Sequence, residues 1–515
     1  MYDENLRKNR IYNSSRMFII SVFYMIVSTI VPFIVRTLMI YYLGDVYAGI
    51  NSVLVSIISL LSMTDLGLGT AIVFFLYEPV ARKDKTTIQS YLNVLRKAYY
   101  YIGITILIIG FLLTPFLSFL VGNDVPEDVN IYIIFIVYVV SIVIPYMYYP
   151  EIQCYVFAMQ RGDVINATNF ISNILAYIMQ IIAIVYIHSF SAYFISLFIQ
   201  TLLNCGFRRI VKSKFCSEIV PDGKLDLRSS NALKKKVVAL LGHQMDEKFI
   251  ASVDNLVLSH FCGLVVVTVY GNYMYVVSAV FLILSSVFDS ISASMGNAIV
   301  TETKESNYAR FNTVLWMNGM LVVWVCACLI CMYQPFMTIW MSDRLLPVST
   351  MLLFVLYFFV IQIRRTVLTF KNVSGMWWED RYKPYVSMIV NLLMDIVLVK
   401  NIGVNGALIS SIICIAFIEI PWEANVLCRE LFEKNVFRYL IKVLSFLGIA
   451  IINSGVVYIL SINIFRTTGI FGLIVRGIFA SIISIFTIFV VYHKSVEMKA
   501  WKGTLKLILK NFNLE

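Results

Sequence analysis

The stretch RTLMIYYLGDVYAGIN at residues 36–51 resembles DNLVLSHFCGLVVVTVYGNY at residues 254–273, and this pair indicates an internal repeat. Each copy closes one predicted helix, passes a glycine (Gly44 or Gly263) and enters an apolar run that ends in GTAIV or GNAIV. The two copies predict two lobes built from the same helical unit. Because an even number of apolar segments separates the copies, both lobes enter a membrane in the same direction, as in parallel transporter repeats.

The composition places the whole chain in a membrane. Of its 515 residues, 60% are hydrophobic and only 14% are charged, whereas soluble domains carry about a quarter charged residues. A bilayer core of about 30 Å needs roughly 20 apolar residues per helix. By that measure the chain contains about 14 segments, at residues 17–42, 47–77, 98–121, 130–158, 165–187, 190–207, 237–260, 264–300, 311–333, 347–370, 384–400, 403–427, 437–462 and 468–492.

The predicted fold is therefore an all-α integral membrane protein with two six-helix lobes related by a parallel pseudo-twofold repeat, plus two C-terminal helices. The longest polar connection, RRIVKSKFCSEIVPDGKLDLRSSNALKKK, follows the sixth segment. It sets the expected boundaries: an N-lobe at 1–215, a C-lobe at 216–435, and helices 13 and 14 with a basic amphipathic tail at 436–515.

Basic residues alternate between loops and give the orientation. They are concentrated in both termini and in every second loop, and only Arg344, Lys400 and Arg466 fall in the opposite set of loops. Cytoplasmic loops are enriched in Lys and Arg, so both termini are expected in the cytoplasm. The net charge of +11 then reflects orientation and contact with anionic lipid, and it calls for no nucleic-acid partner.

Two unlike charges occupy matching positions when the glycines are aligned. Arg36 and Asp254 each lie several residues before the outer end of a helix, and a charge at membrane depth normally pairs or faces water. One interpretation makes them an outer gate pair that meets across the lobes when the outer side closes. The alternative is that each pairs locally or extends its charged end to the interface.

The seventh segment, LLGHQMDEKFIASVDN, holds an unusual number of polar residues. Gln244, Glu247 and Lys248 share one helical stripe, which suits the wall of a water-filled cavity. Arg364 and Arg365 continue a later apolar run and are predicted to line the same substrate cavity. The alternatives are an amphipathic surface helix for the seventh segment and a helix-end anchor for the arginine pair.

Several carboxylates also fall within spans. Asp65 and Asp289 are pseudo-equivalent, and they predict either coupling to H⁺ or Na⁺ or an interhelical hydrogen bond. Glu151, Asp395, Glu419 and Glu423 are similarly placed, and each is expected to need a partner, because an unpaired charge in hydrocarbon is costly.

The sequence contains no recognisable motif for binding a nucleotide, a metal or a cofactor. The chain has no Walker A pattern or dinucleotide glycine motif. Cys326, Cys328 and Cys331 lie among Leu, Val and Ile, where packing is the expected role. No metal, cofactor or ATP hydrolysis is therefore predicted.

At the family level, RTLMIYYLGDVYAGINSVLVSIISLLSMTDLGLGTAIVFFLYEPVARKD and IRRTVLTFKNVSGMWWEDRYKPYVSMIVNLLMDIVLVKNIGVNGALISSII resemble the Wzx-type polysaccharide flippases. These belong to the multidrug/oligosaccharidyl-lipid/polysaccharide exporter (MOP) superfamily. The resemblance runs through essentially the whole chain in diffuse membrane patterns. It implies alternating access by two six-helix lobes in the bacterial inner membrane.

The same resemblance implies an undecaprenyl-pyrophosphate-linked oligosaccharide repeat unit as substrate, moved to the outer leaflet for surface polysaccharide or O-antigen synthesis. Membrane lipid and a polysaccharide polymerase are the implied partners. Lipid II flippases and MATE-type drug exporters are alternatives within the superfamily. A membrane polymerase or acyltransferase is the enzyme alternative, although the outer loops are short and the chain has only four histidines.

Overall fold

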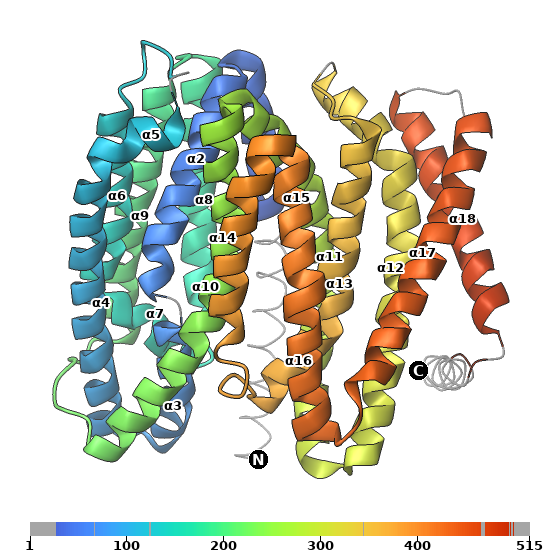
Figure 1. The fold of residues 1–515 in the computed structure, drawn as a ribbon. Helices are drawn as coiled ribbons and strands as arrows, with labels where there is room; N and C mark the ends of the chain where they lie inside the picture. Colours follow the sequence, from blue (N-terminus) through green and yellow to red (C-terminus); the bar gives the residue numbers. More distant parts are fainter. Residues whose placement is uncertain are drawn as a thin grey trace, which may run out of the picture. The chain divides into compact units, whose positions relative to one another are not determined.

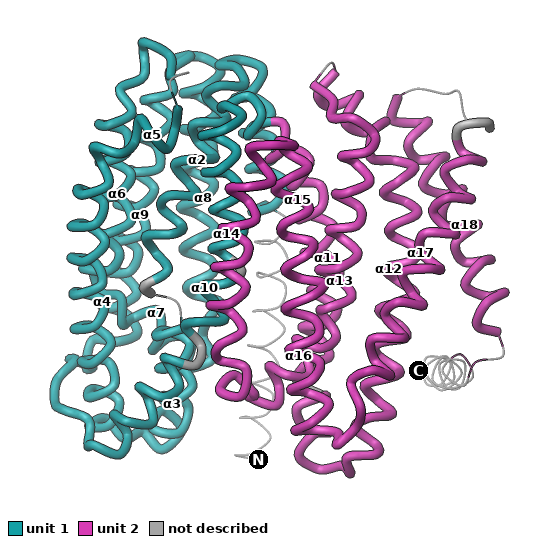
Figure 2. Tube along the Cα trace, in the orientation of Figure 1, with its two compact units in different colours: residues 1–268 teal, residues 269–515 magenta. Residues whose placement is uncertain are grey.

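A computed structural model describes residues 27–65, 67–122, 125–342, 344–464 and 469–493, together with 495 and 498. Within these residues the chain is helical and contains no strand, which confirms the all-α class. It divides into two compact units, residues 1–268 and 269–515, coloured separately in Figure 2. The lobe boundaries expected from the sequence remain predictions, and the amphipathic tail beyond residue 498 lies outside the described part.

The first unit holds the helices of the N-terminal half (Figure 1). They are Val27–Tyr42, α2 Asp45–Leu61, α3 Leu68–Arg82, α4 Lys85–Leu113, α5 Leu117–Val121, α6 Ile131–Met147, α7 Pro150–Ala158, α8 Gly162–Val185, α9 Phe190–Phe215 and α10 Leu227–Cys262. The second unit begins within α11 and holds α11 Leu264–Thr301, α12 Lys304–Met341, α13 Val348–Ser374, α14 Lys383–Ile402, α15 Val404–Ile413, α16 Ile420–Leu427, α17 Val436–Ile464 and α18 Gly469–Tyr492.

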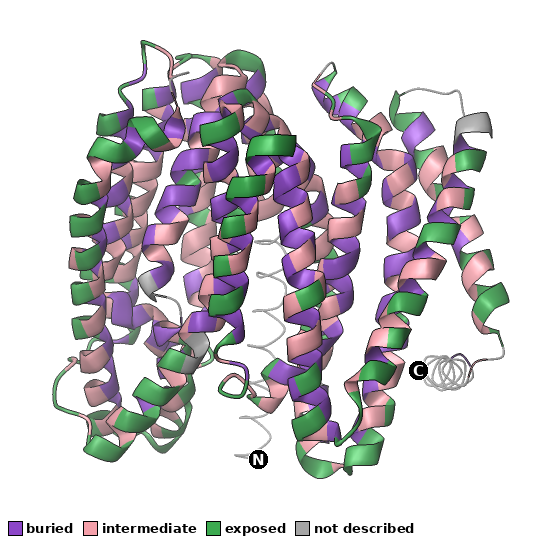
Figure 3. Ribbon diagram, viewed as in Figure 1, coloured by how far each residue is buried: buried purple, intermediate pink, exposed green. Residues whose placement is uncertain are grey.

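Ten of the described helices are long and apolar enough to span a membrane, and the bent pair α6 and α7 makes an eleventh. The other predicted spans correspond to Val27–Tyr42, to α2 with α3, and to the polar α10. On α18, Ile474, Ile478, Ile482 and Ile485 are each more than half exposed. Such an exposed apolar face is typical of a helix that contacts lipid; exposed residues on this helix are green in Figure 3. The chain is thus a multi-pass membrane protein.

Capping side chains explain where several helices start. Asp84, Asn130, Ser189, Asp226 and Thr303 each accept a hydrogen bond from the amide three residues ahead, at 3.1–3.3 Å. These bonds satisfy amides that have no partner within the helix. The starts of α4, α6, α9, α10 and α12 are therefore encoded locally.

The two glycines aligned by the sequence repeat have the same backbone conformation. Gly44, before α2, has φ 114° and ψ 169°, and Gly263, after α10, has φ 86° and ψ 168°. Side-chain-bearing residues rarely adopt this region. The matching conformations give structural support to the internal repeat.

Two predicted spans prove to be broken helices. The span expected at 47–77 ends its first helix at Leu61, and α3 starts after Gly67, which has a left-handed φ of 98°. The span expected at 130–158 bends by 53° between α6 and α7. Pro145 within α6 and Pro150 at the start of α7 explain the second break, because proline removes an amide donor and clashes with the preceding turn.

The linker after α9 packs against the first unit. Lys85 Nζ lies 2.6 Å from Glu218 Oε2, and Asn93 donates to the carbonyl of Gly223 at 2.7 Å. The hydrogen bond and charge of Lys85 lower the pKa of Glu218. Residues 216–226 thereby follow the surface of α4.

Candidate functional site

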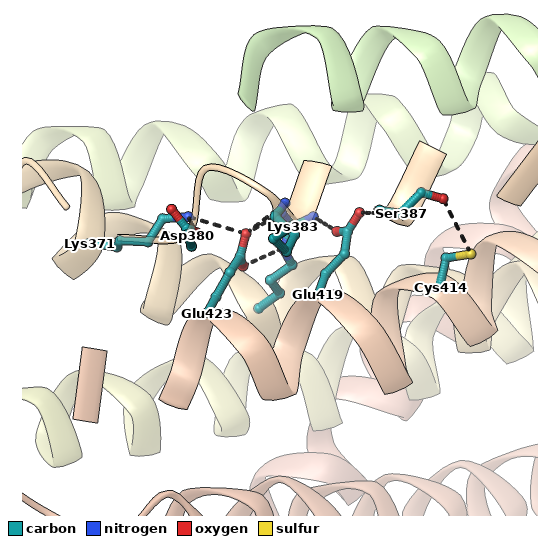
Figure 4. A network of polar contacts seen from close by, with 8 residues as sticks. Lys371, Asp380, Lys383, Ser387, Cys414, Glu419 and Glu423 are labelled. Carbon is teal, nitrogen blue, oxygen red and sulfur yellow. Dashed lines mark hydrogen bonds and ion pairs between the residues drawn. The ribbon is translucent and has the colours of Figure 1, made fainter. Parts of the chain in front are cut away.

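Six ionisable side chains form a buried network in the second unit (Figure 4). They comprise three cations and three carboxylates: Arg364, Lys371, Lys383, Asp380, Glu419 and Glu423. The side chain of Arg364 is 17% exposed, and the other five residues are at most 1% exposed. Because the formal charges cancel, the group can stay ionised inside the helix bundle.

The cations come from two helices. Arg364 and Lys371 are seven residues apart on α13, which is about two helical turns, so their side chains share one face of the helix. Lys383 is the first residue of α14. Asp380 lies in the short connection between these helices and places its carboxylate 2.5 Å from Lys371 Nζ.

The two glutamates flank a proline in one interrupted helix. A π-helical segment, Cys414–Glu419, leads into α16, and Pro421 occupies its first turn. Proline cannot donate to the preceding turn, and π segments often accompany functional sites in helices. Glu419 and Glu423 are four residues apart and therefore project from the same side.

Glu423 is the centre of the network. Arg364 donates to it through Nε at 2.8 Å and Nη2 at 2.7 Å. Lys371 Nζ and Lys383 Nζ approach the same carboxylate at 3.3 and 3.0 Å. The third guanidinium nitrogen of Arg364 pairs with Glu419, so this arginine bridges both glutamates.

A polar stripe continues from this network along α14. Ser387, which donates to Glu419 at 2.6 Å, is followed at four-residue intervals by Asn391 and Asp395, and all three are fully buried. Asp395 accepts a hydrogen bond from Ser410 on α15, and Asn391 lies 3.4 Å from the same hydroxyl. At 1.5 Å per residue, the stripe from Lys383 to Asp395 extends about 18 Å.

The second predicted cavity arginine, Arg365, has a different partner. Its Nη2 lies 2.5 Å from Asp289 Oδ1 on α11, with the two side chains 22% and 66% exposed. The structure thus joins a residue predicted for substrate binding to one predicted for ion coupling. Because the side chain of Asp289 is 66% exposed, solvent reaches this ion pair. Substrate binding by Arg365 and ion coupling by Asp289 both stay predictions.

Arg36 is held within the first unit. Its Nη1 donates to Ser52 Oγ and its Nη2 to the carbonyl of Thr268, both at 3.2 Å. Asp254 is buried on α10, also in the first unit. Local contacts therefore account for the placement of Arg36, and the outer gate formed with Asp254 stays a prediction.

The polar stripe of α10 is on a partly accessible side of the helix. Lys248 is exposed and Gln244 is half-buried. Asn255, farther along, donates to Ser56 Oγ on α2 at 3.0 Å. The side chains of Glu247 and Asp65 lie outside the described part of the structure.

Sequence reasoning missed half of the ion network. Lys371, Asp380 and Lys383 look like ordinary loop and helix-end charges, because they fall where the apolar pattern of the spans stops. The one local signal is spacing: Lys371 follows Arg364 by two helical turns, and Lys383, Ser387, Asn391 and Asp395 recur every four residues.

Comparison with known proteins shows the fold. No protein-family model matches the chain, and no curated protein matches it. Among solved structures, "Lipid II flippase MurJ, inward closed conformation" matches with a TM-score of 0.68 and 16% identity, over 92% of this chain and 99% of that one.

Transporter structures also match. The eukaryotic MATE transporter AtDTX14 has a TM-score of 0.55 and 12% identity, covering 84% of this chain and 98% of its own. A mutant of the Vibrio cholerae MATE transporter VcmN has a TM-score of 0.52 and 15% identity, covering 84% and 99%. The chain has the two-lobe fold of these flippases and exporters.

Proposed function

We propose that this protein is a flippase that moves a polyprenyl-pyrophosphate-linked oligosaccharide repeat unit from the cytoplasmic to the outer leaflet of a bacterial inner membrane. The observation that carries the proposal is the fold match to a lipid II flippase over 92% of this chain. That match has a higher TM-score and a larger coverage of this chain than the match to the MATE transporter AtDTX14, with 0.68 and 92% against 0.55 and 84%. The difference favours a lipid-linked substrate over a small drug.

The headgroup of such a lipid needs a protein to cross the membrane. A pyrophosphate and a glycan cannot cross about 30 Å of hydrocarbon unaided, because each unpaired charge or hydroxyl is costly to bury. Polar side chains along the helices lower that barrier for the headgroup, while the lipid tail stays in the bilayer. Two states that differ by a few kcal/mol suffice for such exchange.

We propose different roles for the four cations that the sequence predicts to face the substrate. Arg36 and Lys248, both in the first unit, are proposed to attract the pyrophosphate, for which guanidinium and ammonium groups are suited. Arg364 is bound by two glutamates, so it is proposed to position α13 against α16. Arg365 is proposed to exchange between Asp289 and the substrate.

The gate between Arg36 and Asp254 has a direct test. Reversing either charge alone, as Arg36→Asp or Asp254→Arg, is expected to reduce transport. The double reversal is expected to restore it if the two side chains meet during the cycle. Failure of the double variant to exceed both single variants would refute the gate.

The enzyme alternative predicts a different accumulation of intermediates. In cells that make a polysaccharide dependent on this protein, depletion is expected to leave single lipid-linked repeat units on the cytoplasmic leaflet. Leaflet-specific labelling of the glycan measures this. Accumulation of single units on the outer leaflet would instead favour the polymerase and overturn the flippase proposal.

A further inference from the structure

A cavity of about 630 Å³ lies wholly within the first unit, among α3, α4, α6, α7 and α9. Exposed Thr70 and the half-exposed ring of Tyr77 form part of its rim. All the residues that line it belong to residues 69–208, so the cavity needs nothing from the second unit. None of the roles proposed above uses it.

The lining combines rings, hydrogen-bonding groups and one charge. Tyr77, Tyr99, Tyr146 and Phe157 supply aromatic surface, and Arg208 is the one charged side chain among the lining residues. Ser141, Gln153 and Thr201 add hydroxyl and amide groups. This mixture suits a polar headgroup that also presents C–H surface, rather than a purely apolar tail.

The break between α6 and α7 fixes the position of the arginine. Because α6 ends at Met147, the carbonyl of Pro145 has no amide partner in a following turn. Arg208 on α9 donates to that carbonyl through Nη1 at 2.9 Å, and its Nη2 lies 3.4 Å from Gln153 Oε1. The guanidinium is thus held at the wall of the cavity before any ligand arrives.

Gly69 allows close packing in another part of the cavity wall. A Cβ atom placed on Gly69 would lie 2.8 Å from the hydroxyl oxygen of Tyr99. That separation is too short for a non-bonded contact, so any side chain at position 69 would push the tyrosine ring. The absence of a side chain lets the hydroxyl of Tyr99 approach α3.

The electrostatic surroundings favour an anion. Glu151, buried beside Pro150, has neither carboxylate oxygen in a hydrogen bond. Glu151 is not among the residues that line the cavity, and Arg208 is the one charged side chain that is, so the lining carries a positive charge that attracts an anion.

We propose that this cavity binds the phosphate-bearing headgroup of a membrane lipid. The phosphoryl oxygens bind Arg208, whose planar guanidinium suits phosphate. The glycerol or sugar part of the headgroup lies against Tyr77 and Tyr146 and hydrogen-bonds with Gln153 and Thr201. The chemistry is shared by anionic phospholipids and by polyprenyl-pyrophosphate sugars, and the inference holds whether or not the protein is a flippase.

Native mass spectrometry of the purified full-length protein in detergent tests the site. The probes are phosphatidylglycerol, a diacylglycerol with the same acyl chains, and a polyprenyl-pyrophosphate hexose. We expect one phosphate-bearing lipid to stay bound when diacylglycerol dissociates. Equal retention of diacylglycerol would overturn the proposal, because the phosphate would then contribute nothing.

Two variants on the same helix locate the binding. Thr201→Phe fills the cavity, whereas Leu202→Phe adds the same ring at an exposed neighbouring position outside it. Thr201→Phe and Arg208→Lys are each expected to weaken lipid retention about tenfold, and Leu202→Phe to leave it unchanged. Equal retention by Thr201→Phe and Leu202→Phe would place the lipid elsewhere and refute the site.

A rim pair keeps the test decisive if Thr201→Phe does not fold. Tyr77→Ala removes a ring from the cavity, and Tyr100→Ala removes one of similar exposure from outside it. Only Tyr77→Ala is expected to lower retention, and equal effects would refute the site. Preference for phosphatidylglycerol would assign a resident phospholipid, and preference for the polyprenyl probe would assign a subsite for the proposed substrate. Lipid retention without transport would contradict the flippase proposal alone.

Discussion

Neutralising Glu423 removes the anion on which three buried cations converge. In Glu423→Gln, Arg364, Lys371 and Lys383 would share only Asp380 and Glu419, which leaves one uncompensated positive charge in the protein interior. The NH2 group of the glutamine side chain would also face the N–H donors of these three cations, with no acceptor between them. Removing one partner of a buried ion pair costs about 3–5 kcal/mol.

The expected effect on melting follows from the size of the second unit. Domains of 150–250 residues lose about 2–4 °C in Tm per kcal/mol, so a cost of about 3–5 kcal/mol is expected to lower the melting temperature of the variant by roughly 6–20 °C. Thermal unfolding of the purified protein, followed by size-exclusion fluorescence, measures this shift. The matched control is Glu430→Gln, because Glu430 pairs with Arg429 at an exposed site, where an ion pair contributes at most about 1 kcal/mol.

A second variant separates charge imbalance from lost packing. Combining Glu423→Gln with Lys383→Met restores neutrality, so the double variant is expected to melt higher than Glu423→Gln alone. A role for Glu423 in balancing the buried charges is refuted if Glu423→Gln melts within about 2 °C of Glu430→Gln, or if the double variant is no more stable than the single one.

Three further predictions follow from the same contacts. Gly263→Ala is expected to lose about 1–3 kcal/mol in stability because of its positive φ, whereas Gly206→Ala, with open space around it, is expected to be neutral or slightly stabilising; Tm values compare them. Asp289→Asn is expected to change Tm little, since the Asp289 side chain in its pair with Arg365 is 66% exposed, and thermal unfolding measures this. Arg36→Ala is expected to slow flipping at least about tenfold in reconstituted vesicles, and Arg36→Lys to slow it less, because a single ammonium keeps the charge but not both contacts to Ser52 and Thr268.

The sequence predicts the membrane class and the order of helices well, because both depend on local composition. Apolar length identifies the spans, whereas the capping bonds of Asp84, Asn130 and Ser189, which set the helix starts, are seen only in the structure. Gly44 and Gly263 are also recognisable, since their repeat context and their shared conformation agree. The breaks after Leu61 and within 131–158 escape a prediction based on apolar length alone, although Gly67, Pro145 and Pro150 are local signals for them.

The site is harder to predict because its partners come from separate helices. The sequence indicates that Glu419 and Glu423 need partners, yet their pairing with Arg364 depends on how α13 packs against α16. Lys371 and Lys383 resemble solvated loop charges until that packing buries them. Charge and spacing identify candidates, and only the tertiary arrangement decides which of them meet.

Reconstituted transport tests the flippase proposal most directly. The purified protein is placed in vesicles with a fluorescent polyprenyl-pyrophosphate oligosaccharide, and a membrane-impermeant reagent that destroys exposed glycan reports the leaflet of each molecule. We expect glycan in the inner leaflet to become accessible with this protein and to stay protected in protein-free vesicles. Protection that is the same with and without the protein, in a preparation that is folded by its melting profile, would contradict it.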